Sequence, residues 1–99
     1  MPRLVVRARA RAEIREIFDW YLARSPDAAG RFIDAVDAAV AEISDAPERF
    51  PVIHGRLRRR LLSRFPYGVY YKIFPAVVSV VGVIHGHRHP DAWLGRAEP

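Results

Sequence analysis

The sequence predicts a single α+β domain over residues 1–99. An antiparallel helix hairpin is expected to pack on one face of a small, mainly antiparallel sheet, in the order β-α-α-β-β-β. Three observations lead to this fold. A length of 99 residues suits one domain. Two stretches in the first half carry apolar residues at helical spacing. Three strand-like stretches separated by turn residues occupy the second half.

The first half begins with a short apolar strand at residues 4–6, followed by two helices. We expect the helices over about residues 8–23 and 26–45. Ser25, followed by a proline and an aspartate, is a strong helix start. Pro47 ends the second helix. Because only a few residues separate the helices, they should form an antiparallel hairpin.

The second half is expected to fold as three consecutive strands, over about residues 57–65, 69–74 and 77–85. A loop rich in proline and glycine, over residues 45–55, should precede them. A three-residue hairpin loop, Pro66-Tyr67-Gly68, would set the register of the first pair. The expected cross-strand pairs are Phe65 with Val69, Leu61 with Ile73, Ile73 with Val78 and Tyr71 with Val80.

This register predicts two different sheet faces. The face toward the helices is apolar, and the expected core is Phe18, Phe32, Val36, Leu61, Tyr71, Ile73 and Val80. The far face carries Arg58, Arg60, Arg64, Tyr70, Lys72, Ser79 and His85, interleaved with Leu62, Phe74, Val77, Val81 and Val83. A solvated face is not usually so apolar. Either a partner covers it, or the chain's own tail does, with Trp93 and Leu94.

Composition excludes several chemistries. The chain has no cysteine, which rules out disulfides, zinc–thiolate sites and thiol catalysis. The longest apolar run, residues 76–84, is too short to span a bilayer, and the N-terminus lacks an apolar signal region. We therefore expect a cytoplasmic protein without a cofactor.

The net charge of +5 is unevenly distributed. Six Arg against three acids give +3 over residues 1–24, and two Arg against six acids give −4 over residues 25–50. Seven Arg and Lys72 against two acids give +6 over residues 51–99. Such a chain can meet nucleic acid, an acidic protein or a membrane surface. The preference for Arg over Lys fits a GC-rich genome, whereas the clustering of Arg fits phosphate or carboxylate binding.

Four segments in order resemble the RelE/ParE-type toxins. These are Ala29 with Phe32 at the start of the second helix, the proline-rich loop over residues 46–56, the hairpin over residues 60–71 and the last strand and tail over residues 83–93. The resemblance implies the toxin of a type II toxin–antitoxin system, neutralised by an antitoxin, here expected to be acidic, that wraps around it. One branch of the superfamily, ParE, poisons DNA gyrase, and the other, RelE, cuts mRNA on the ribosome.

The RelE alternative requires groups for RNA cleavage. A base must take the proton of the 2′-hydroxyl, a cation must stabilise the phosphorane and an acid must protonate the leaving oxygen. By resemblance, arginines would hold the phosphate, and a Tyr, Lys or His would transfer the proton. The candidate catalytic residues of this alternative are Arg60, Arg64, Tyr70, Lys72, His85 and Arg88.

Two departures favour the ParE-like branch instead. The lysine-rich segment of ribosome-dependent cleavers is absent, since Lys72 is the sole lysine. No tyrosine follows Tyr71, and the tail offers Trp93, which cannot act as a general acid. A protein that inhibits gyrase by contact needs a binding surface rather than a catalytic set. The expected target-binding residues are Arg58, Arg60, Arg64, Arg88 and Trp93.

Other interpretations of single motifs remain open. Three alternating histidines, His85, His87 and His89, have the spacing of metal ligands on one face of a strand. Neighbouring glycines and a proline disfavour a regular strand there, so we expect no metal. The arginines at residues 58–60 fit a nucleic-acid patch or a charged edge strand. Trp20 and Tyr21 fit hairpin packing better than a base-stacking platform. A basic nucleic-acid-binding domain without toxicity is the third class, and it predicts salt-sensitive binding.

Overall fold

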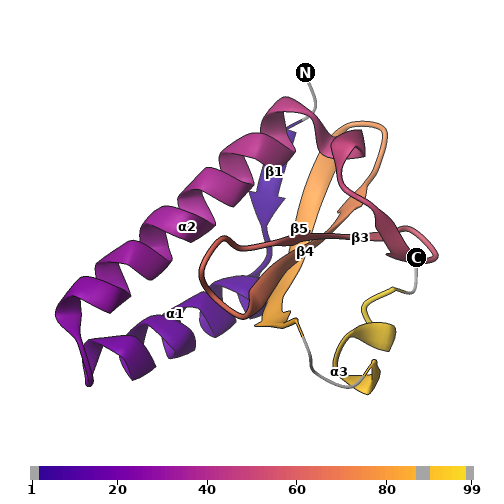
Figure 1. Ribbon diagram of the computed structural model, residues 1–99. Helices are drawn as coiled ribbons and strands as arrows, with labels where there is room; N and C mark the ends of the chain where they lie inside the picture. Colours follow the sequence, from indigo (N-terminus) through magenta and orange to yellow (C-terminus); the bar gives the residue numbers. More distant parts are fainter. Residues whose placement is uncertain (1–2, 87–89, 98–99) are drawn as a thin grey trace.

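A helix hairpin lies against one face of a five-stranded sheet, and a short C-terminal helix lies on the other side (Figure 1). The computed structural model describes residues 3–86 and 90–97. Its elements are β1 (Arg3–Val6), α1 (Ala8–Leu22), α2 (Pro26–Asp45), the 3₁₀ helix η1 (Pro47–Arg49), β2 (Val52–His54), β3 (Leu57–Leu61), β4 (Tyr67–Ile73), β5 (Val77–His85) and α3 (Asp91–Leu94). The expected α+β class and its helix hairpin are confirmed.

The strand order in the sheet is β1-β5-β4-β3-β2. β1 pairs with β5 in parallel, and the other neighbours are antiparallel. Three elements were not predicted, namely β2, η1 and α3. β2 and η1 both lie within the segment expected to be a loop, because Pro47 starts a 3₁₀ turn and Val52 pairs with Arg58 of β3. The tail forms α3.

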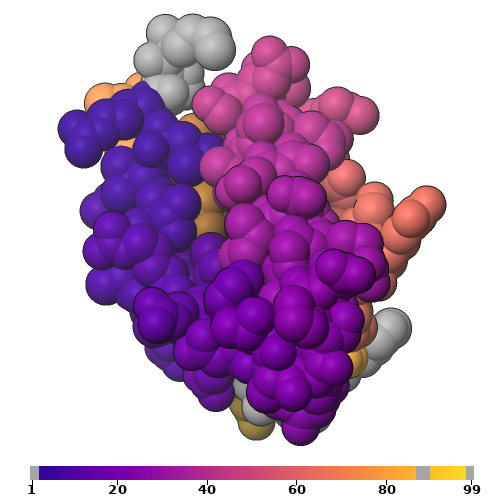
Figure 2. Space-filling model, turned by 90° about the vertical axis from the view of Figure 1, so that its left-hand side faces the viewer, coloured from indigo at the N-terminus to yellow at the C-terminus, as the bar shows by residue number. Residues whose placement is uncertain are grey.

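Local signals account for the helix boundaries. The Ser25 hydroxyl oxygen accepts a hydrogen bond from the Ala28 N–H at 3.2 Å, and Pro26 takes the first position of α2. Both features satisfy or avoid backbone donors that a helix start leaves without partners. α1 and α2 then run side by side on the outer surface (Figure 2).

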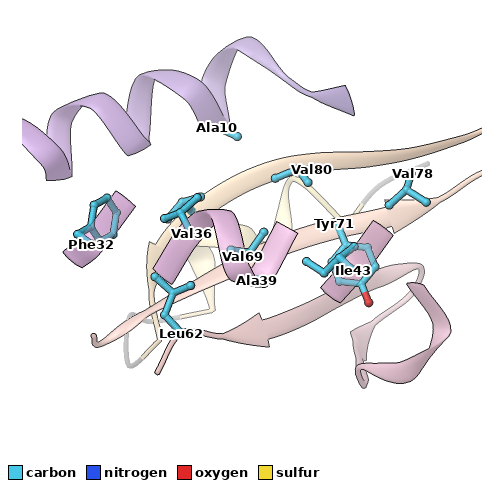
Figure 3. Close-up of a cluster of buried hydrophobic side chains, with 11 residues drawn as sticks. Ala10, Phe32, Val36, Ala39, Ile43, Leu62, Val69, Tyr71, Val78 and Val80 are labelled. Carbon is cyan, nitrogen blue, oxygen red and sulfur yellow. The ribbon is translucent and has the colours of Figure 1, made fainter. Parts of the chain in front are cut away.

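The main core fills the space between this hairpin and the sheet (Figure 3). Phe32, Val36, Tyr71 and Val80 are buried as expected, and Phe18 and Ile73 pack against the core while partly buried. Leu61 was wrongly placed in the core, since it is 47% exposed. Leu62 and Val83, expected on the far face, belong to the core instead.

The error at Leu61 follows from the register of β3 with β4. Leu61 pairs with Gly68 and not with Ile73, which shifts the pairing by five positions. An odd shift turns every side chain of a strand to the opposite face. The chain turns over residues 62–66, where Arg64 has a left-handed φ of 67°, so Gly68 lies inside β4 instead of in the turn.

The register of β4 with β5 is confirmed near its turn, where Ile73 pairs with Val78 and Tyr71 with Val80. The register then shifts, because Tyr70 pairs with Gly82 and leaves an extra residue in β5. Such a bulge reverses the alternation of faces beyond it. Val83 therefore lies opposite Val69 and points toward the helices.

Candidate protein-contact surface

The far face of the sheet is covered by the chain's own tail. A second apolar cluster of Leu57, Tyr70, Ile84 and Ala97 lies there, with Trp93 packed against it. The Trp93 ring stacks on Tyr70 with ring centroids 6.4 Å apart and an interplanar angle of 28°. The sequence left two alternatives for this face, a partner or the tail. In the structure the tail covers it.

Arg58 and Arg60 point toward the helices, contrary to expectation, because of the odd register shift of β3. The Arg58 guanidinium donates to the backbone oxygens of Glu48, at 3.1 Å, and Phe50, at 2.7 Å. Arg60 Nη2 lies 3.1 Å from Glu42 Oε1 on α2. Arg58 thus joins β3 to the segment that follows α2, and Arg60 joins β3 to α2 itself.

Tyr71 reinforces the same junction. Its hydroxyl donates to the Pro47 oxygen at 2.5 Å. Burial raises the pKa of Tyr71 above its ordinary value, while the nearby Arg58 acts in the opposite direction. The phenol therefore stays protonated at neutral pH and remains a donor to η1.

We expect Arg60→Ala to lower the free energy of unfolding by about 1–2 kcal/mol, since a charge-assisted hydrogen bond is lost and Glu42 is exposed enough to be hydrated again. Urea denaturation measures this loss. Arg15→Ala is the matched control, because Arg15 and Asp19 form a pair in which both side chains are exposed. Equal stability of both variants would show that the Arg60–Glu42 pair does not hold β3 to α2.

Among the remaining predicted site residues, those within residues 3–86 and 90–97 do not meet at one place. Arg64 is exposed in the β3–β4 turn. Tyr70 is fully buried beneath Trp93, and Lys72 is buried. The His85 ring lies edge-on to Tyr67, with centroids 5.5 Å apart. Arg88 lies outside the described residues, as do His87 and His89.

These positions bear on the cleavage alternative. Arg60 lies on the helix side of the sheet, whereas Tyr70 lies on the far side. The sheet would therefore separate a phosphate bound by Arg60 from the Tyr70 hydroxyl, and a phosphate bound beside Tyr70 from the Arg60 guanidinium. Tyr70 has no path to an RNA hydroxyl while Trp93 covers it.

Trp20 differs from the expected hairpin packing. Tyr21 does pack, against Phe32 and Phe65. Trp20 is 52% exposed instead, with the Arg24 guanidinium 3.8 Å from its ring centroid. A cavity of about 420 Å³ lies between α1 and the ends of β4 and β5, and its lining includes Ile17, Trp20, Tyr67 and Val83.

Neither a cluster of metal-ligating side chains nor a membrane-spanning helix lies within residues 3–86 and 90–97. No group of three or more His, Asp or Glu side chains in this part of the chain is placed to hold a metal ion. In the same ranges, no helix combines the length and the apolar character that crossing a bilayer requires.

The fold and the dispersed polar residues together define a small α+β protein whose candidate functional features are surfaces. The family model described as "ParE toxin of type II toxin-antitoxin system, parDE" matches residues 4–90. The chain therefore belongs to the ParE toxin family.

One similar solved structure is titled "Chromosomal ParDE TA system from P. aeruginosa". It aligns with a TM-score of 0.76 and 17% sequence identity, over 86% of this chain and 96% of the other. At this identity the similarity concerns the fold. A comparison with curated proteins gave no match.

Proposed function

We propose that this protein is the toxin of a type II toxin–antitoxin pair, and that it acts in the cytoplasm by inhibiting DNA gyrase through protein–protein contact. The family match over residues 4–90 carries this proposal. The scattered positions of the cleavage candidates support contact over RNA cleavage, since Arg60 and Tyr70 lie on opposite sides of the sheet.

The proposed contact surface includes Arg64, Arg88 and Trp93. Arg64 belongs to the turn over residues 62–66, and the Gly86 N–H donates to the Pro66 oxygen of this turn at 2.6 Å. The turn therefore adjoins the point where the chain leaves β5, two residues before Arg88. Arg58 and Arg60 are removed from the proposed surface, because they bind η1, its flanking segment and α2.

The proposed partner is a cognate antitoxin with acidic character. The net charge of +5 and the excess of +6 over residues 51–99 favour an acidic partner. An antitoxin that wraps around the toxin would prevent gyrase from reaching the same surface.

The test is controlled expression of the chain with and without the neighbouring candidate antitoxin gene, followed by identification of the lesion. Growth arrest with DNA breaks, and blocked supercoiling by purified gyrase, are the expected results. Cuts in translated mRNA would replace the proposal with the ribonuclease function. Salt-sensitive binding of free DNA without growth arrest would replace it with a nucleic-acid-binding function.

A further inference from the structure

The tail is joined to α1 by an ion pair between residues 83 positions apart in the sequence. Arg96 Nη1 donates to Glu13 Oε1 and Arg96 Nη2 to Glu13 Oε2, each at 2.8 Å. The side chains are only 10% and 22% exposed, respectively. Two parallel, charge-assisted hydrogen bonds in a partly buried place are among the stronger polar contacts in proteins.

The same two side chains complete the hydrogen bonding of β5. β1 pairs with β5 only as far as Val80, so the edge of β5 loses its neighbouring strand at that point. Glu13 Oε1 accepts from the Val83 N–H at 3.0 Å, and Arg96 Nη1 lies 3.3 Å from the Val81 oxygen. Glu13 and Arg96 thus take the place of the missing strand.

Gly82, between these two backbone groups, makes the arrangement possible. A Cβ atom at Gly82 would overlap the Arg96 guanidinium and would lie 3.3 Å from Glu13 Oε1. Any side chain at this position would therefore displace Arg96 from the edge of β5.

The tail depends on contacts with the rest of the fold for its conformation. α3 contains four residues and has no side-chain cap at its N-terminus. A helix of this length is not stable alone in water. The order of the tail must come from its contacts, which include the stacking of Trp93 on Tyr70, the contact of Trp93 with the His54 ring, the burial of Ala97 and the Arg96 ion pair.

We propose that Glu13, Gly82 and Arg96 form a latch that holds the tail on the sheet and thereby positions Trp93. Glu13, Gly82 and Arg96 are not themselves part of the main core, so the latch is expected to open without unfolding the helix hairpin. Positioning Trp93 for the target rests on the proposed function, whereas the latch itself does not.

The test uses the two tryptophans of the chain. Trp20→Phe leaves Trp93 as the single fluorescent reporter of the tail. In this background, Glu13→Gln, Arg96→Gln and Gly82→Ala are each expected to shift the Trp93 emission to longer wavelength and to increase its quenching by acrylamide. Amide-exchange protection over residues 91–97 should fall by about tenfold, the loss expected for a buried charged pair. Protection in α2 should not change.

Glu16→Gln is the matched control, because Glu16 is an exposed acid on the same helix. It should leave the Trp93 emission unchanged. Should Gly82→Ala fail to fold, the two side-chain variants still decide the question. Unchanged emission and protection in both Glu13→Gln and Arg96→Gln would overturn the latch.

A second measurement, inhibition of gyrase supercoiling, tests the positioning role. If Trp93→Ala and the latch variants all lose inhibition, the positioning role is supported. If Trp93→Ala loses inhibition while variants with a released tail keep it, the positioning role is overturned. If the parent protein does not inhibit gyrase, the proposed function fails, and the fluorescence result for the latch still stands.

Discussion

Replacing Phe32 with alanine is expected to lower the free energy of unfolding by about 3–5 kcal/mol. Phe32 is fully buried, and its ring centroid lies 5.8 Å from Tyr21, 5.6 Å from Phe65 and 5.8 Å from Tyr67. These three rings come from α1, from the β3–β4 turn and from β4. Because separate parts of the fold hold them, they cannot collapse together into the cavity that the substitution leaves.

Urea denaturation followed by circular dichroism measures this loss. Leu22→Ala is the control, since Leu22 is a large apolar residue that is exposed near the end of α1. It should change stability by less than about 0.5 kcal/mol. A loss below about 1 kcal/mol for Phe32→Ala would contradict the placement of this ring at the centre of the core.

Arg64→Gly is expected to weaken binding to gyrase by about thirtyfold, which corresponds to about 2 kcal/mol, without lowering stability. Arg64 is exposed and lies in the proposed contact surface. Its φ of 67° suits glycine better than arginine. The substitution therefore removes the guanidinium while relieving backbone strain, so lost binding cannot be attributed to unfolding.

Binding of purified gyrase and thermal unfolding should be measured on the same samples. Arg31→Ala is the comparison variant, because Arg31 is also exposed and lines the same surface hollow as Arg64 but lies on α2. Full affinity of Arg64→Gly would exclude Arg64 from the contact. Trp93→Ala is a less direct probe than its tail position suggests, since Trp93 also covers Tyr70.

Features encoded by neighbouring residues could be predicted from the sequence. The helix boundaries depend on Ser25, Pro26 and Pro47, which act on the backbone within one turn. The β4–β5 pairs next to their turn were likewise correct. The β3–β4 register was not, because Pro66-Tyr67-Gly68 has the composition of a tight turn while the chain turns earlier. A non-glycine residue at a left-handed φ carries no clear sequence signal.

The candidate site was harder to predict for the same reason. The wrong register predicted for β3 placed Arg58 and Arg60 on the far face, whereas they lie on the helix side. On the far face they looked like exposed side chains that could bind phosphate. The Glu13–Arg96 pair joins distant parts of the chain, and no local pattern marks it. Gly82, a glycine inside a run of β-branched residues, was the available hint that another group approaches the strand closely.

The parallel pairing of β1 with β5 sets an order of events during synthesis. β1 spans Arg3–Val6, yet its partners are Val77 to Val80, so its backbone hydrogen bonds with β5 cannot form until Val80 has left the ribosome. The helix hairpin and the β3–β4–β5 meander join residues that are close in sequence and can assemble earlier. β1 therefore waits for β5, through the synthesis of the helix hairpin, β3 and β4, before it can enter the sheet.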